Sequence, residues 1–171
     1  MTTNIELAKQ VADHVALQSV TLKSATIDTA LDPLALPGQV GMTQGYRSNF
    51  ERVPTNDRDK LVVTVDFKFN AKEEDDSPSE LVALTASFCL IYWLEPNVSI
   101  EDRCFRHFAE VNGPYNAWPY WRELVQSVTG RVGMAGVTIP VFRVTATAVD
   151  IPGETKPAAA KPRATVRAKR T

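Results

Sequence analysis

The segment NGPYNAWPYWRELVQSVTGRVG, residues 112–133, contains the clearest structural pattern in the chain. Asn112-Gly113-Pro114 predicts a turn. Asn116 can cap a following helix, and Pro119 is tolerated in its first turn because that amide has no intrahelical partner. One face of this predicted helix carries the large apolar side chains, which are Trp118, Trp121, Val125, Val128 and Val132. A helix face with two tryptophans requires a large apolar surface to pack against.

The sequence before this segment predicts an antiparallel sheet. In residues 61–70 the odd positions are all apolar and the even positions are polar except Val62, as expected for a strand with one buried face. Residues 81–94 are apolar on both alternating faces, which predicts a central strand covered on each side by this chain or by a partner subunit. In residues 20–28 the alternation changes phase near Lys23 and Ser24, which predicts a β-bulge. Residues 46–53 are a weaker strand candidate.

Two further helices and a long loop complete the predicted pattern. Apolar residues recur at helical spacing over residues 5–16, and Ser99 opens a second helix that runs to about residue 111. Residues 32–45 contain too many Pro and Gly residues for a regular element. This loop is unusually apolar and either caps the local core or lines a binding groove. Residues 137–149 form an extended, β-branched segment interrupted by Pro140.

Composition predicts a globular protein with a basic tail. The 171 residues are 44% apolar and 23% charged, with a formal net charge of −1. We expect an N-terminal amphipathic helix over residues 1–17, a folded domain over residues 18–152 and a disordered tail over residues 153–171. The tail holds six basic side chains against Glu154 alone. It has either no specific role or a weak affinity for nucleic acid, the ribosome or another acidic surface.

The predicted compartment of the protein depends on two features that the sequence lacks, a secretory signal and a membrane-spanning stretch. The N-terminus lacks a basic start followed by an apolar run, so no secretory signal is expected and the cytoplasm is the predicted compartment. The longest apolar stretch, residues 81–94, is too short to span a bilayer, so no membrane insertion is expected.

The sequence offers no catalytic or metal-binding pattern. Cys89 and Cys104 do not form a CxxC pair, and neither His14 nor His107 has ligand-type neighbours at a known spacing. No nucleophile motif is present, and the glycines of residues 130–136 follow a helix instead of a strand. We therefore expect a non-enzyme without cofactor or metal. The carboxylates of residues 73–76 predict a solvated hairpin loop, with docking of a basic partner as the alternative.

Three segments resemble the SecB family of molecular chaperones. Residues 115–123, Tyr-Asn-Ala-Trp-Pro-Tyr-Trp-Arg-Glu, resemble the family's stretch that ends in Phe-Pro-Tyr-Ala-Arg-Glu. Residues 137–142, Val-Thr-Ile-Pro-Val-Phe, are similar to its Leu-x-Leu-x-Pro-x-Asn-Phe segment, and residues 17–28 are similar to its bulged first strand.

This resemblance implies an α+β fold in which helices pack on one side of a four-stranded antiparallel sheet. It also implies a homo-tetramer, a dimer of dimers, that pairs through the first strand and then through the long helix. The oligomer interface would contain Trp118, Trp121, Val125 and Val128. A groove for client polypeptides would be formed by the loop and the strands, with ordinary core as the alternative for each residue. The groove candidates are Leu34, Leu36, Val40, Met42, Tyr46, Phe50, Phe88 and Trp93.

The implied function is that of an ATP-independent holdase, which binds unfolded polypeptides and takes part in protein export. The export family carries two acidic residues on its first strand for docking the translocase motor ATPase, whereas this chain has Ser24 and Asp28. Asp28 is therefore the single candidate for that contact. One alternative is a chaperone dedicated to one partner such as an antitoxin. An alternative of another class is an oligomeric scaffold whose tail tethers nucleic acid.

Overall fold

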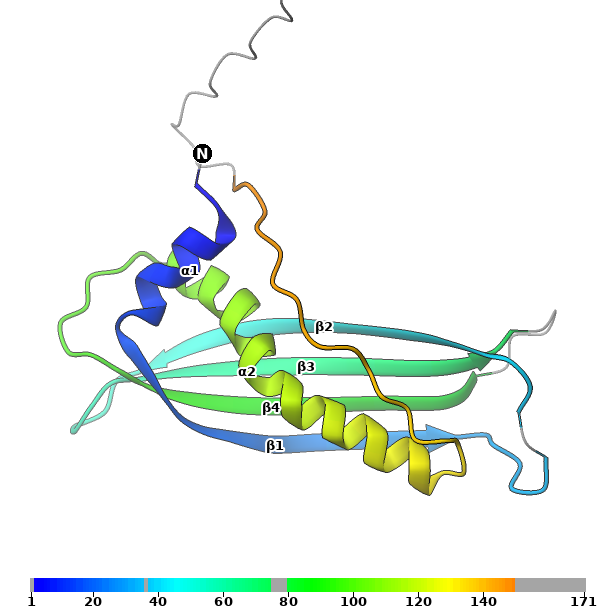
Figure 1. The fold of residues 1–171 in the computed structure, drawn as a ribbon. Coiled ribbons are helices and arrows are strands. Elements are labelled where there is room, and N and C mark those ends of the chain that lie inside the picture. The colour runs from blue at the N-terminus through cyan, green and yellow to red at the C-terminus, as the bar shows by residue number, and fades with distance from the viewer. Residues whose placement is uncertain (1, 36, 75–79, 150–171) are drawn as a thin grey trace, which may run out of the picture.

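The computed structural model describes residues 2–35, 37–74 and 80–149, so Leu36 and the predicted tail lie outside the described residues. The order along the chain is α1 (Asn4–Ala12), β1 (Val15–Thr29), β2 (Val40–Val53), β3 (Lys60–Glu73), β4 (Glu80–Leu94) and α2 (Asp102–Arg131). The strands form one antiparallel sheet in the order β1-β4-β3-β2, and both helices lie on one side of it (Figure 1). The predicted α+β fold is confirmed.

The sheet has one buried and one open face because side chains alternate along each strand. On β3 and β4 the residues that face α2 are almost fully buried, and they form the core with α1 and α2. The other face of β4, which includes Cys89, Ile91 and Trp93, stays partly exposed. No element of the described chain covers it, so its predicted coverage by a partner stays a prediction.

The bulge predicted in the first strand is present. The register of β1 against β4 shifts between Leu22 and Ser24, and again between Leu17 and Ser19. Each extra residue returns the apolar side chains to the face that carries α2, so Leu17, Leu22 and Ile27 lie opposite Tyr92, Phe88 and Leu84. The bulges therefore keep β1 in phase with the core over its full length.

Two predicted boundaries were wrong. The first helix ends at Ala12, before residue 16, because Val15 already pairs with Leu94 as a strand. Its start is fixed by a capping box in which Thr3 and Glu6 exchange hydrogen bonds between side chain and backbone. The predicted loop of residues 32–45 ends at Gln39, and residues 40–45 extend the weak strand candidate into the fourteen-residue strand β2.

The turn predicted at Asn112-Gly113-Pro114 was also wrong. Residues 102–131 form one helix that contains Pro114 and Pro119, although an interior proline costs about 3 kcal/mol in an isolated helix. Packing offsets this cost, since Gly113 and Pro114 are both buried and Gly113 lies against the sheet. Asn116 is therefore a residue of the helix interior instead of a cap, and its side-chain amide donates to the Tyr92 hydroxyl at 3.0 Å.

After α2 the chain reverses and runs back beside it. Gly133 adopts φ +95°, a backbone conformation that favours glycine, and Thr129 accepts a hydrogen bond from the Val137 amide at 2.9 Å. Residues 137–149, which we call the return segment, then follow α2 back to the start of α1 (Figure 1). The return segment is not part of the sheet, and Thr3 and Ala148 form an isolated bridge.

Candidate functional site

Helix α2 is too narrow to cover the whole sheet. Four strands spaced about 4.8 Å apart span roughly 14–19 Å, whereas a helix with its side chains is about 10–12 Å wide. Helix α2 packs on β2, β3 and β4, but it has little contact with β1. Apolar side chains on the helix-covered face are therefore left exposed along both edge strands. They are Leu17, Leu22 and Ile27 on β1, each 46% exposed, and Met42 and Tyr46 on β2, 53% and 46% exposed.

The open face of the sheet has a different character. It carries the ion pair between Arg47 and Asp66, at 3.3 Å, and Lys60 lies over the Trp93 ring at 4.9 Å. A shallow depression of about 580 Å³ on this face is lined by a mixture of polar and apolar residues, among them Lys68, Thr85 and Ala86. The exposed apolar surface is thus concentrated on the face that carries α2.

The return segment contacts Tyr46 of β2 and Trp118 and Arg122 of α2, and we call this contact surface the aromatic groove. Tyr46 lies on β2 and makes an edge contact with Phe142 of the return segment, with ring centroids 5.6 Å apart. Trp118 on α2 contacts the same Phe142 ring at 5.1 Å. Burial raises the pKa of the Tyr46 hydroxyl, and the Glu110 carboxylate raises it further. Tyr46 is therefore neutral at physiological pH and suited to apolar contact.

Two side chains of α2 donate hydrogen bonds to the backbone of the return segment. The Trp118 Nε1–H donates to the carbonyl oxygen of Pro140 at 2.8 Å. One helical turn further on, the Arg122 Nε–H donates to the carbonyl oxygen of Ile139 at 2.9 Å. Both contacts are to main-chain atoms, which every peptide offers, so this part of the groove binds an extended backbone irrespective of its sequence.

The structure places the predicted groove residues on different parts of the molecule. Val40, Met42 and Tyr46 share the helix-covered face of β2, and Tyr46 belongs to the aromatic groove. Leu34 is 95% exposed in the loop between β1 and β2, and Leu36 lies outside the described residues. These positions leave Val40, Met42 and Tyr46 as candidates on a common surface.

Of the other predicted groove residues, Phe50 and Phe88 lie on the helix-covered face beneath α2, and Trp93 lies on the opposite face. Phe50 stacks on Phe105 of α2 at 5.9 Å, and Phe88 is only 3% exposed. Trp93 lies on the open face of the sheet, an odd number of residues from Phe88 along β4. A single groove containing both Phe88 and Trp93 is therefore excluded by the alternation of the strand.

The four predicted interface residues lie in the core of this chain. Trp118, Trp121, Val125 and Val128 are all less than 9% exposed, and Trp121 stacks on Phe67 with ring centroids 5.0 Å apart. The aromatic face of the helix thus packs on its own sheet. A role for these four residues in assembly stays a prediction.

Asp28 is exposed near the end of β1, opposite Ala83 of β4. Ser24 lies on the same strand at the rim of the polar depression. Asp28 is therefore accessible to a partner, and its predicted contact with the translocase motor stays a prediction.

Sequence reasoning missed the roles of Arg122 and Phe142. Arg122 was not among the predicted site residues, and Phe142 entered only through the family resemblance. A signal was present in Pro140, because proline cannot donate to a strand ladder and so argues against pairing of this β-branched segment in the sheet. What lies beneath such a segment depends on the tertiary structure.

Among the described residues, no group of three or more His, Cys, Asp or Glu side chains could hold a metal ion. The histidines pair singly with carboxylates, His14 with Glu95 at 2.7 Å and His107 with Glu110 at 3.0 Å. No helix in the part of the chain that the structure describes has the length and apolarity needed to cross a membrane.

Comparison with known proteins places this fold. No family model matches the sequence, and no curated protein matches it. Among solved structures, the chain is similar to the Mycobacterium tuberculosis SecB-like chaperone in complex with a ChAD peptide from the HigA1 antitoxin. The TM-score is 0.65 at 14% identity, covering 82% of this chain and 98% of that one. A Streptococcus agalactiae protein of unknown function is similar at a TM-score of 0.47 and 12% identity, covering 74% and 96%. The sheet order, the single long helix and the likeness over almost the whole mycobacterial protein identify the architecture of this chain as the SecB-like fold.

Proposed function

We propose that this chain is a molecular chaperone, an ATP-independent holdase that binds extended segments of unfolded polypeptides. One observation carries the proposal: the helix-covered face keeps half-exposed apolar side chains along the edge strand β2, which are Met42 and Tyr46. Surface of this kind competes with the self-association of unfolded clients. The SecB-like fold supports the same function.

Assembly into a dimer of dimers is part of the proposal. Strand β1 is an edge strand of fifteen residues whose outer backbone groups have no sheet partner, an arrangement that favours pairing with another strand. Burial of Leu17, Leu22 and Ile27 would contribute about 1 kcal/mol each, or about 6 kcal/mol in a symmetric pair. Since association costs at least about 4 kcal/mol, backbone pairing must add to this apolar contribution.

A chaperone dedicated to one partner is the second candidate. The similar mycobacterial chaperone is bound to an antitoxin peptide, which favours an antitoxin as the client of this chain as well. Docking on the translocase motor ATPase has weaker support, because Asp28 is the single candidate carboxylate. Cys89 and Cys104 are both unpaired, which fits a reducing compartment such as the cytoplasm.

The test is suppression of aggregation of a chemically unfolded client, measured by light scattering without nucleotide. We expect suppression by the wild-type protein and loss of it in Met42→Glu, which places a charge on the apolar face of β2. Thr43→Glu is the matched control, because the neighbouring side chain points to the opposite face. No suppression at a severalfold molar excess of the wild type would contradict the holdase function.

A pull-down from cells separates the two candidates. A general holdase captures many unfolded proteins, whereas a dedicated chaperone captures one dominant partner. Assembly is tested by the mass of the particle in solution. Leu22→Glu should reduce this mass and Thr21→Glu should leave it unchanged, because Thr21 lies on the open face.

A further inference from the structure

The return segment is extended and apolar in part, and it is held by side-chain packing and separate hydrogen bonds instead of a strand ladder. Ile139 is buried and Phe142 is half-buried, but most of the residues between 140 and 148 are exposed. No strand ladder holds the segment along the described chain, apart from the single bridge between Thr3 and Ala148. Segments with few buried contacts and exposed backbone bonds open at a small fraction of the cost of global unfolding. The return segment is therefore suited to leave the groove while the sheet and α2 stay folded.

The aromatic groove holds this segment as it would hold a separate peptide. Carbonyl groups of two successive residues, Ile139 and Pro140, accept hydrogen bonds from Arg122 and Trp118. Two residues after Pro140, the Phe142 ring fills the space between Trp118 and Tyr46. The contacts comprise two main-chain hydrogen bonds, one buried aliphatic side chain and one aromatic side chain three positions later.

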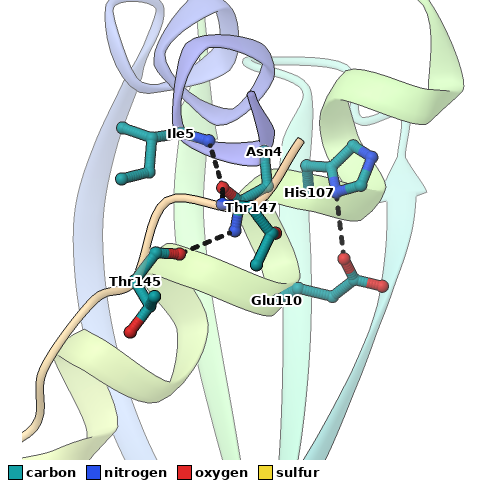
Figure 2. Close-up of polar contacts among 6 residues, drawn as sticks. All are labelled: Asn4, Ile5, His107, Glu110, Thr145 and Thr147. Atoms are coloured by element: carbon teal, nitrogen blue, oxygen red, sulfur yellow. Dashed lines mark hydrogen bonds and ion pairs between the residues drawn. The ribbon is translucent and has the colours of Figure 1, made fainter. Parts of the chain in front are cut away.

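The far end of the segment is fastened to α1 (Figure 2). The Asn4 side chain donates to the Thr145 carbonyl at 3.2 Å and accepts from the Thr147 amide at 2.9 Å, as Figure 2 shows. The Asn4 amide also donates to the Thr147 carbonyl at 3.0 Å, and the Val149 amide donates to the Thr2 carbonyl at 3.0 Å. These bonds lie on exposed residues, remote from the aromatic groove.

We propose that the aromatic groove is the client-binding site and that the return segment occupies it in the free protein as an internal substitute for a client. A client displaces residues 137–149 and presents an extended segment with an aliphatic residue followed, three positions later, by an aromatic one. This inference rests on the proposed chaperone function and names the site and the client chemistry for it. The apparent affinity for clients is then lowered by the fraction of molecules in which the groove is filled.

The experiment measures binding of a fluorescently labelled peptide with the sequence of residues 137–149, VTIPVFRVTATAV, by fluorescence anisotropy. The full-length variant Phe142→Ala removes the internal aromatic anchor and leaves Tyr46, Trp118 and Arg122 in place. We expect it to bind the peptide at least about tenfold more tightly than the wild type, because more of the grooves are vacant. Val141→Ala is the matched control, since Val141 is 61% exposed and should leave the affinity unchanged.

Further variants and a modified peptide keep the test decisive if Phe142→Ala perturbs the fold. Circular dichroism monitors the fold of each variant. Asn4→Ala loosens the far end without touching the groove and should also raise peptide affinity, by a smaller factor. A peptide with alanine in place of its own phenylalanine should lose most of its binding. In the Phe142→Ala background, Trp118→Phe keeps a ring but removes the N–H donor and should weaken the peptide severalfold.

Failure of this inference and failure of the proposed function are distinguishable. If the wild type suppresses aggregation but Phe142→Ala and Asn4→Ala bind the peptide no more tightly than Val141→Ala, the return segment does not compete with clients. The inference is then overturned and the chaperone function stands. If Phe142→Ala binds the peptide tightly while no variant suppresses aggregation, the groove is a peptide site and the holdase function is overturned.

Discussion

Gly113 brings α2 unusually close to the sheet, and replacement of this residue tests that packing directly. A Cβ atom added at Gly113 would lie 2.8 Å from Cγ1 of Val63 and 3.1 Å from Cγ2 of Val65. Both valines are fully buried on β3 and are stiff at χ1, so neither methyl group can rotate away. Gly113→Ala must therefore move the helix or distort the strand.

The expected cost combines two opposing effects. Alanine in place of an interior glycine favours a helix by about 1 kcal/mol. Overpacking of a dense core costs about 1–3 kcal/mol, and more when the neighbours cannot relax. We expect the steric effect to win, so that Gly113→Ala lowers the free energy of unfolding by about 1–2 kcal/mol. At this chain size the melting temperature should fall by about 2–8 °C.

Gly130 provides a matched control in the same helix. A Cβ atom at Gly130 has no neighbour within 4 Å, so Gly130→Ala should keep the propensity gain and raise stability by up to about 1 kcal/mol. The assay is urea unfolding followed by tryptophan fluorescence, with the slope m checked for constancy. Addition of Val63→Ala should cost less in the Gly113→Ala protein than in the wild type. A Gly113→Ala protein as stable as the wild type would refute the close-approach argument.

Three further predictions concern single buried groups. Thr129→Val removes the hydroxyl that accepts from the Val137 amide, so it should lower the free energy of unfolding by about 1–3 kcal/mol in urea titrations, whereas Thr129→Ser should cost less. Burial raises the pKa of Tyr92 to about 12, above the value near 10 expected in the unfolded chain. Its contribution to stability is then complete below about pH 10 and is lost as the pH rises toward 12, and Tyr92→Phe should flatten this alkaline decline. Burial also raises the pKa of the Cys104 thiol, so iodoacetamide should alkylate Cys89 well before Cys104 in the folded protein, as mass spectrometry of the labelled peptides can determine. Equal labelling rates would contradict the burial of Cys104.

Local patterns predicted the strands well. The alternation of residues 61–70 and the change of phase near Lys23 follow from the two-residue period of a strand, which any covered sheet imposes whatever its partners. The position of the bulge could therefore be read from the sequence, and β1 contains it between Leu22 and Ser24. The extension of β2 back to Val40 could not be read from the sequence. The glycines in this stretch weaken the local strand signal, and pairing with β3 decides where the strand begins.

The sequence by itself determined which side chains are apolar, where strands alternate and that no catalytic pattern is present. The tertiary structure decided which apolar surface meets which. At Gly113-Pro114 the local preference for a turn was overcome because a continuous helix buries both residues and brings Gly113 against β3. The contacts that Trp118 makes within the chain, with the Phe142 ring and the carbonyl oxygen of Pro140, could not be predicted from the sequence. Burial of apolar surface is non-directional, so a sequence specifies that such a face must be covered, while only the fold specifies what covers it.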